Sequence, residues 1–186
     1  MHKDISKILL TGEEIAKRTA EIAAQITKDY EGQEVLMVGI LRGAVLFFSE
    51  LVKRIDLDLR MDFMAVSSYG ASMTSSGEIK INKDLSQPIE GLNVIIVEDI
   101  IDTGHTLKNL LRLLETRNPK SIKICSLLDK PERREVELEG DYVGFKVPNE
   151  FVVGYGLDYN ERYRNLPDVC VLKKSIYAHC PDEDYD

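Results

Sequence analysis

The fold is decided by one stretch of the sequence, Val94-Ile95-Ile96-Val97-Glu98-Asp99-Ile100-Ile101-Asp102-Thr103-Gly104-His105-Thr106-Leu107. Its four leading β-branched residues predict a buried strand, and two acids follow at the strand's end. After a short turn rich in glycine and hydroxyl groups, leucines repeat at helical spacing, at Leu107, Leu110, Leu111 and Leu114. This order predicts an open α/β sheet with the turn at the carboxyl end of a strand, where such sheets bind ligands.

The turn between this strand and this helix, Asp102 to Thr106, has the features of a phosphate site. Free backbone N–H groups and the helix dipole at a helix N-terminus favour anions. Gly104 lets the backbone approach a phosphate closely, and Thr103 and Thr106 add hydroxyl donors. The turn therefore predicts a site for a phosphate group.

The acidic pair before the turn, Glu98 and Asp99, narrows which phosphate compound is expected. Two carboxylates beside an anion site repel the ligand unless something offsets their charge. Sugar hydroxyls do so by donating hydrogen bonds, and Mg²⁺ does so by binding carboxylate and phosphate oxygens together. The simpler alternative is an ordinary strand and helix with solvated acids at the turn. The full pattern favours a sugar phosphate site with Mg²⁺.

The same stretch resembles the phosphoribosyl pyrophosphate signature of the type I phosphoribosyltransferases, in which a hydrophobic strand, two acids and two apolar residues precede a short Thr/Gly turn. From Glu98 to Gly104 it looks most like the hypoxanthine-guanine branch, because Asp102 stands where the adenine branch usually has Ala. The resemblance implies the type I phosphoribosyltransferase fold, an α/β fold whose parallel-core sheet is flanked by helices. It also implies a small hood formed by the terminal segments and a flexible active-site loop.

Length and charge indicate one domain and disfavour two classes of partner. With 186 residues the chain can bury a sizeable core as a single domain. We expect a core over about 30–145, a hood from the N-terminal segment and about 146–178, and an acidic tail over 181–186. The net charge of −8 disfavours nucleic acid and anionic membranes, which attract basic surfaces.

The cysteines and the apolar segments indicate a cytoplasmic protein. Cys125, Cys170 and Cys180 have no metal-ligand spacing, and their odd number and scatter predict free thiols in a reducing compartment. No stretch approaches the ~20 apolar residues of a membrane helix. The N-terminus lacks the apolar core of a signal peptide.

Strands and helices alternate along the chain, which favours a parallel sheet. A capping box at Thr11-Gly12-Glu13-Glu14 opens the first helix. We predict strands over 34–40, 57–63, 121–128, 142–146 and 151–154, and a helix over 44–52. The segment from Ser67 to Gln87 is long and polar, and we expect a loop there that is functional or disordered.

A second candidate phosphate site is the turn Leu41-Arg42-Gly43, which also lies between a predicted strand and a predicted helix. Backbone N–H groups in such a turn can hold a phosphate group, although an ordinary connecting loop with a surface Arg42 is an equal alternative. In the resembled family this tripeptide is the pyrophosphate loop, and it tends to carry a cis peptide between its first two residues. The resemblance therefore implies pyrophosphate contacts from Leu41, Arg42 and Gly43.

The long polar loop begins with Ser68 and Tyr69. Mobile loops commonly close over reactive intermediates and exclude water. The resembled enzymes have a Ser-Tyr pair in a flexible loop of this kind, which implies that Ser68 and Tyr69 close over the active site. The alternative from the residues alone is a disordered insertion.

The late part of the chain resembles the purine-binding end of the hypoxanthine-guanine family. The resemblance implies that Phe151 stacks on the purine, that the Val152 backbone reads the ring edge, and that Lys130 binds the 6-oxo oxygen. An ammonium group only donates, so it prefers a 6-oxo acceptor to a 6-amino donor. The resemblance further implies that Asp158 binds Mg²⁺ and that Arg164 contacts pyrophosphate.

Together these assignments imply a purine salvage enzyme that converts phosphoribosyl pyrophosphate and hypoxanthine or guanine into IMP or GMP. The 5′-phosphate would lie on Asp102 to Thr106 and the ribose hydroxyls on Glu98 and Asp99, while Asp102 would accept the N7 proton. His105 departs from the family pattern, because many relatives have Lys there, and its contribution to phosphate charge is in doubt.

Two alternatives remain open. A regulator of the same fold would sense phosphoribosyl pyrophosphate and bind nucleic acid, but such regulators usually lose catalytic residues and carry a basic face. A pyrophosphokinase that makes phosphoribosyl pyrophosphate would be much longer. No single residue decides between hypoxanthine, guanine and xanthine. Members of the resembled family form dimers and tetramers, which implies a homodimer or a homotetramer here.

Overall fold

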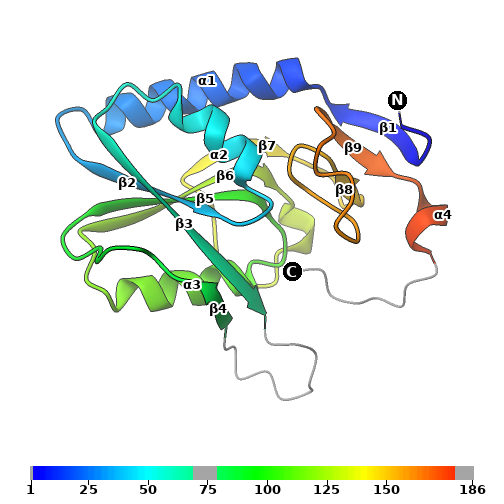
Figure 1. Cartoon of the computed structure of the whole chain (residues 1–186). Helices are drawn as coiled ribbons and strands as arrows, with labels where there is room; N and C mark the ends of the chain where they lie inside the picture. The colour runs from blue at the N-terminus through cyan, green and yellow to red at the C-terminus, as the bar shows by residue number, and fades with distance from the viewer. Residues whose placement is uncertain (1, 69–78, 179–186) are drawn as a thin grey trace.

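The computed structural model describes residues 2–68 and 79–178, and a six-stranded sheet forms the body of this part of the chain (Figure 1). In spatial order its strands are β4 (Ile79–Lys83), β3 (Leu59–Ser68), β2 (Val35–Ile40), β5 (Asn93–Ile101), β6 (Ser121–Asp129) and β7 (Tyr142–Lys146). All neighbouring pairs are parallel except β3 and β4. The carboxyl ends of β2, β5 and β6 therefore meet at one edge of the sheet.

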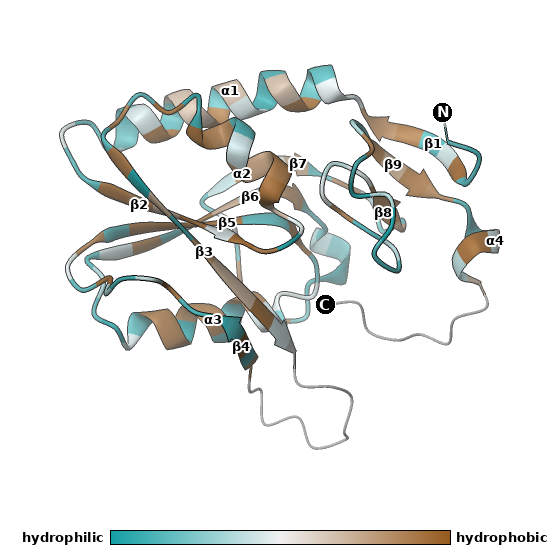
Figure 2. Cartoon of the chain, in the orientation of Figure 1, coloured by the Kyte–Doolittle hydropathy of each residue, from teal (hydrophilic) through white to brown (hydrophobic). Residues whose placement is uncertain are grey.

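Helices cover both faces of this sheet, which explains why β2 and residues 94–97 of β5 are apolar on both faces (Figure 2). α1 (Gly12–Asp29) and α2 (Val45–Val52) pack on one face, and α3 (His105–Glu115) packs on the other. Successive side chains of a strand point to opposite faces, so Met37 joins the cluster with α1 and α2 while Val38 joins the cluster with α3.

Most of the predicted elements are present. The strands predicted over 34–40, 121–128 and 142–146 and the helix over 44–52 agree with β2, β6, β7 and α2 to within a residue at each end. The predicted capping box opens α1, because Thr11 accepts a hydrogen bond from the Glu14 backbone N–H and Glu14 accepts one from the Thr11 N–H. Local sequence signals therefore set these boundaries.

A second, smaller sheet lies beside the carboxyl edge of the first (Figure 1). Its strands are β1 (Ile5–Leu10), β9 (Val169–Leu172) and β8 (Val152–Val153), and the short helix α4 (Lys174–Tyr177) follows β9. β1 and β9 are antiparallel, with Ile5 opposite Leu172. The two ends of the described chain are thus joined above the edge where ligands are expected.

The prediction for the segment from Ser67 to Gln87 was partly wrong. It contains the strand β4, which pairs antiparallel with β3, and β3 itself runs further than the predicted 57–63. The side chains of Ile79 and Ile81 pack on the α3 side of the core, and this burial explains the extra strand. Ser68 ends β3, whereas Tyr69 lies outside the described residues.

The predicted strand over 151–154 is also shorter than expected, since β8 holds only its two central valines. None of the helices in the described ranges combines the length and apolar character needed to cross a bilayer.

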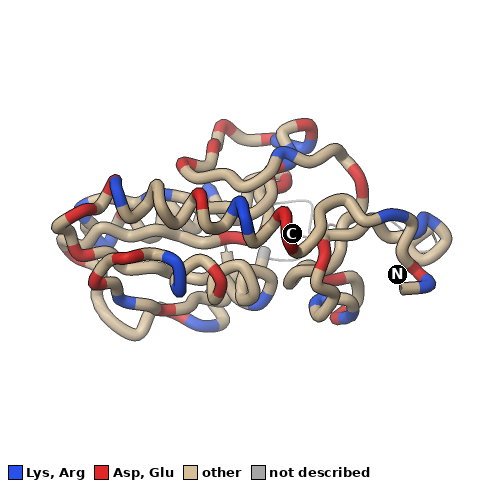
Figure 3. The backbone as a smooth tube through the Cα atoms, turned by 90° about the horizontal axis from the view of Figure 1, so that it is seen from above, with Lys and Arg blue, Asp and Glu red and all other residues tan. Residues whose placement is uncertain are grey.

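Cys125 and Cys170 are buried free thiols, as predicted, and Cys180 lies outside the described residues. In Figure 3, basic residues lie interspersed with acidic ones along the described backbone.

Candidate active site

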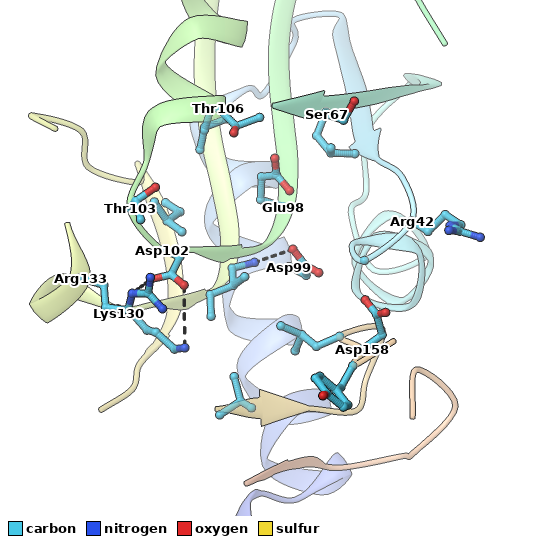
Figure 4. Close-up of a pocket in the computed structure, with 18 of the residues that line it drawn as sticks. Arg42, Ser67, Glu98, Asp99, Asp102, Thr103, Thr106, Lys130, Arg133 and Asp158 are labelled. Atoms are coloured by element: carbon cyan, nitrogen blue, oxygen red, sulfur yellow. Dashed lines mark hydrogen bonds and ion pairs between the residues drawn. The ribbon is translucent and has the colours of Figure 1, made fainter. Parts of the chain in front are cut away.

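A cavity of about 990 Å³ lies between the carboxyl edge of the large sheet and the small sheet (Figure 4). Its walls come from the ends of β2, β5 and β6, from the residues that follow them, and from the segment around β8. Its volume is at the upper end of the range for small-molecule sites. Every described residue to which the sequence assigned a contact lines it, except His105; Ser68 ends β3, and Tyr69 lies outside the described residues.

The predicted phosphate turn forms one wall of this cavity. Gly104 caps α3 with φ +87°, a left-handed conformation that favours glycine, and a Cβ there would lie 2.9 Å from a Val136 methyl. Thr103 and Thr106 line the cavity, and within the described chain the buried Thr106 Oγ1 makes no hydrogen bond. His105 instead turns outward to Glu135, with Nε2 2.9 Å from Oε2. The turn offers backbone and hydroxyl groups rather than a cation.

Glu98 and Asp99 form an acidic pair at the end of β5, facing the same cavity (Figure 4). Burial, and then the neighbouring Asp99, raises the pKa of Glu98 well above its usual range. Burial raises the pKa of Asp99 to about 6, although the hydrogen bond from the Ile100 N–H and the charge of Arg164 oppose this shift. Such a pair is stabilised by hydroxyl donors or by a cation.

The loop after β2 passes close to this acidic pair. Its Leu41–Arg42 peptide bond is cis, as the resemblance implied. A Cβ on Gly43 would lie 1.6 Å from Asp99 Oδ2, so only glycine fits this position. The Arg42 side chain is exposed and pairs with Glu161 instead of entering the cavity (Figure 4). In this state the loop presents its backbone to the site.

Arg164 lines the same cavity as the loop from Leu41 to Gly43. Its Nη2 lies 2.7 Å from Asp158 Oδ1, and its Nη1 donates to the Gly156 carbonyl at 2.8 Å. Its buried Nε donates no hydrogen bond to any described residue. The predicted anion contact and the predicted metal ligand therefore pair with each other, and the Nε–H is among the donors that remain for a ligand.

The predicted purine end brings a cation and an aromatic ring to the cavity. Lys130 follows β6 and is only 6% exposed, and burial lowers the pKa of its ammonium group. Its Nζ lies 4.0 Å from Asp102 Oδ2. The Phe151 ring stacks on Tyr177 with centroids 4.9 Å apart and meets Tyr159 edge-on at 5.5 Å. These contacts fix the orientation of the Phe151 ring.

Among the lining residues that the sequence did not assign to the site are Arg133, Glu161 and Tyr177. Arg133 and Glu161 looked like ordinary surface charges, because no local pattern distinguishes them. The spacing Lys130-Pro131-Glu132-Arg133 was the one available signal, since a proline-initiated turn brings its first and last residues together. Tyr177 reaches Phe151 only through the long-range pairing of β8 with β9.

Comparison with known proteins shows the family of this chain. The family model described as phosphoribosyl transferase domain matches residues 6–160. The chain belongs to the phosphoribosyltransferase family. This phosphoribosyltransferase is 55% identical over 177 residues to the hypoxanthine-guanine phosphoribosyltransferase of Streptococcus thermophilus, covering 95% of this chain and 98% of that one.

Two further relatives of this phosphoribosyltransferase bear on its fold and its length. A crystal structure of a hypoxanthine phosphoribosyltransferase from Staphylococcus aureus matches with a TM-score of 0.92 and 52% identity, over 95% of this chain and 96% of that chain. The bifunctional protein TilS/HprT of Listeria monocytogenes is 54% identical over 178 residues, which is 96% of this chain and 28% of that protein's length. The predicted type I phosphoribosyltransferase fold is confirmed.

Proposed function

We propose that this phosphoribosyltransferase transfers the 5-phosphoribosyl group of phosphoribosyl pyrophosphate to N9 of hypoxanthine or guanine, yielding IMP or GMP and pyrophosphate in purine salvage. The observation that carries the proposal is the pairing of Lys130 Nζ with Asp102 Oδ2, 4.0 Å apart at the cavity wall. A buried donor beside an acceptor matches the 6-oxo oxygen and the protonated N7 on one edge of the purine. The names of the relatives support the same substrates.

The remaining wall residues suit phosphoribosyl pyrophosphate. The 5′-phosphate would bind the turn at Asp102 to Thr106, where α3 begins and its first backbone N–H groups have no acceptor within the helix. The ribose hydroxyls would donate to Glu98 and Asp99. The pyrophosphate would meet the backbone of Leu41 to Gly43 and the Arg164 guanidinium, with Arg42 available once it leaves Glu161. His105 contributes its backbone rather than its ring.

The chemistry that this chain supplies is positioning and proton transfer. Phe151 would stack on the purine, the Val152 backbone would read the ring edge, and Lys130 would hold the 6-oxo oxygen. As N9 bonds to C1′, the bond from C1′ to the pyrophosphate oxygen breaks, and Asp102 takes the proton from N7. Help from a general base of this kind is worth roughly 10²–10⁴-fold in rate.

The residues also suit Mg²⁺, which Glu98, Asp99 and Asp158 would hold. In the part of the chain that the structure describes, no three acidic, histidine or cysteine side chains converge enough to bind a metal alone. This arrangement suits Mg²⁺, which usually takes one or two carboxylates together with substrate phosphates. When bound, Mg²⁺ offsets the charge on the departing pyrophosphate.

The proposal also covers the compartment, the partners and the oligomeric state of the enzyme. We expect the enzyme to act in the cytoplasm on small molecules, without nucleic acid or a membrane, as a homodimer or a homotetramer. The net charge of −8, with basic residues interspersed among acidic ones along the described backbone (Figure 3), supports the expected absence of nucleic acid and of an anionic membrane. Sedimentation velocity would measure the assembly directly.

A base panel tests the proposal. Purified protein is incubated with Mg²⁺, phosphoribosyl pyrophosphate and, separately, hypoxanthine, guanine, xanthine or adenine, and nucleotide formation is followed spectrophotometrically. We expect turnover of hypoxanthine or guanine, none of adenine, and loss of turnover with EDTA that Mg²⁺ restores. Bound phosphoribosyl pyrophosphate without turnover of any base would contradict the enzyme and favour the regulator.

A further inference from the structure

The segment that follows β6 is docked along the phosphate turn. The Arg134 Nε donates to the Asp102 carbonyl at 3.0 Å, and the Glu135 N–H donates to the Thr103 carbonyl at 3.0 Å. Arg134 also pairs with Asp129 at the end of β6, and its side chain is largely buried. The Asp102 and Thr103 carbonyls, which follow the Asp102 side chain along the backbone, are thus held by residues that follow Lys130.

This segment contains a short 3₁₀ turn, η1 (Pro131–Arg133), that brings two cations to one side. The Arg133 N–H donates to the Lys130 carbonyl at 3.1 Å. A 3₁₀ turn has three residues per turn, so side chains three apart in sequence lie on the same side. Figure 4 shows Lys130 and Arg133 both reaching Asp102.

The two cations approach different oxygens of the Asp102 carboxylate. Arg133 Nε lies 3.1 Å from Oδ1, whereas Lys130 Nζ lies 4.0 Å from Oδ2. Oδ1 is buried and accepts no hydrogen bond from a described residue, so the Arg133 contact is an ion pair without hydrogen-bond geometry. Because the side chain as a whole is 19% exposed, Oδ2 is the oxygen that the cavity can reach.

We propose that Arg133 is a positioning residue for the general base. It holds Oδ1 of Asp102 and so presents Oδ2, beside Lys130, to the protonated N7 of the purine. This inference rests on the proposed function, and it assigns Arg133 no contact with the substrate. Loss of such an orienting partner disturbs the reacting geometry more than it disturbs binding.

The test compares Arg133→Gln and Arg133→Lys with the wild type under saturating phosphoribosyl pyrophosphate. The matched control is Glu132→Gln, an exposed position in the same turn that does not line the cavity. We expect Arg133→Gln to lower kcat by about tenfold while KM for hypoxanthine changes by less than about twofold. Arg133→Lys should recover part of kcat, and thermal unfolding of each variant checks the fold.

A double-mutant cycle with Asp102→Asn separates positioning from a structural effect. If Arg133 acts through the carboxylate, Arg133→Gln lowers kcat in the wild type but changes it little in the Asp102→Asn background. An equal loss in both backgrounds would overturn the role, because it would mean that Arg133 supports the turn as a whole. An increase in KM for hypoxanthine at unchanged kcat would also overturn it, since Arg133 would then bind the base.

The same experiment separates this inference from the proposed function. A wild type that converts no purine would contradict the proposed function and, with it, the role of Arg133. An active wild type whose Arg133→Gln variant keeps its kcat would contradict the role of Arg133 alone.

Discussion

A Cβ atom on Gly43 would lie 1.6 Å from Oδ2 of Asp99. Gly43 follows β2, and Asp99 lies near the end of the neighbouring parallel strand β5, in which Val97 pairs with Gly39 of β2. The loop that we assign to pyrophosphate therefore rests directly on the acidic pair that we assign to ribose and Mg²⁺. A substitution in the loop should therefore displace the acidic pair, and a substitution in the acidic pair should displace the loop.

Substitution of Gly43 tests this contact. In Gly43→Ala the new methyl group must displace either the loop backbone or the Asp99 carboxylate, so we expect kcat/KM for phosphoribosyl pyrophosphate to fall by about 10²-fold. The control is Gly32→Ala, where the space is open but φ is +70°, so that stability falls by about 1 kcal/mol without an effect on kcat. Wild-type kinetics in Gly43→Ala would show that the loop has no part in substrate binding.

The raised pKa of Asp99 predicts a pH-dependent stability. Its folded-state value of about 6 lies above the unfolded value near 4, so the folded form holds this proton more tightly. The wild type should therefore lose stability as the pH rises through the interval between these values, and Asp99→Asn should lose less, because only the buried Glu98 of the pair is left to ionise. At pH 8 without Mg²⁺ we expect Asp99→Asn to be more stable by about 1 kcal/mol, because solvent in the cavity reduces the full effect.

Urea unfolding at several pH values between about pH 4 and pH 8 measures this difference. The matched control is Asp58→Asn, which lies at an exposed position on the surface. A gap between Asp99→Asn and the wild type that stays constant with pH would contradict the assigned cause.

The stacking surface of Phe151 gives a third prediction. Phe151→Leu keeps most of the apolar volume packed against Tyr177 but removes the ring, and we expect KM for hypoxanthine to rise about tenfold while KM for phosphoribosyl pyrophosphate stays unchanged. Phe151→Tyr should behave like the wild type because it keeps the ring. Steady-state kinetics with each substrate varied in turn checks both. An equal rise in both constants would mean that the whole cavity had been disturbed.

Local sequence was enough to predict most of β5, the turn from Asp102 to Thr106 and α3, although β5 continues through the acidic pair to Ile101. Four β-branched residues, an acidic pair and a glycine with φ +87° each act within a few residues, and their roles follow from backbone chemistry. The same is true of the capping box at Thr11 and Glu14. The family resemblance then supplied what local chemistry could not, namely the expectation that Lys130 and Phe151 face the same cavity.

Long-range pairing explains what was missed. β4 is short and polar, and only its partner β3 and the contact of its two isoleucines with the core define it as a strand. Arg133 reads as a surface residue until the turn after β6 is seen to lie along Asp102. Tyr177 reaches the site because β9 joins β8. Such contacts depend on the assembled sheets rather than on neighbouring residues.

The most direct test of the account is the kinetics of Asp102→Asn with hypoxanthine and phosphoribosyl pyrophosphate. The amide keeps the size of the side chain but cannot take the N7 proton, so we predict that kcat falls by roughly 10²–10⁴-fold. The dissociation constant for phosphoribosyl pyrophosphate, measured by calorimetry, should stay within about threefold of the wild type. A kcat near that of the wild type would contradict the assignment of Asp102 as the general base.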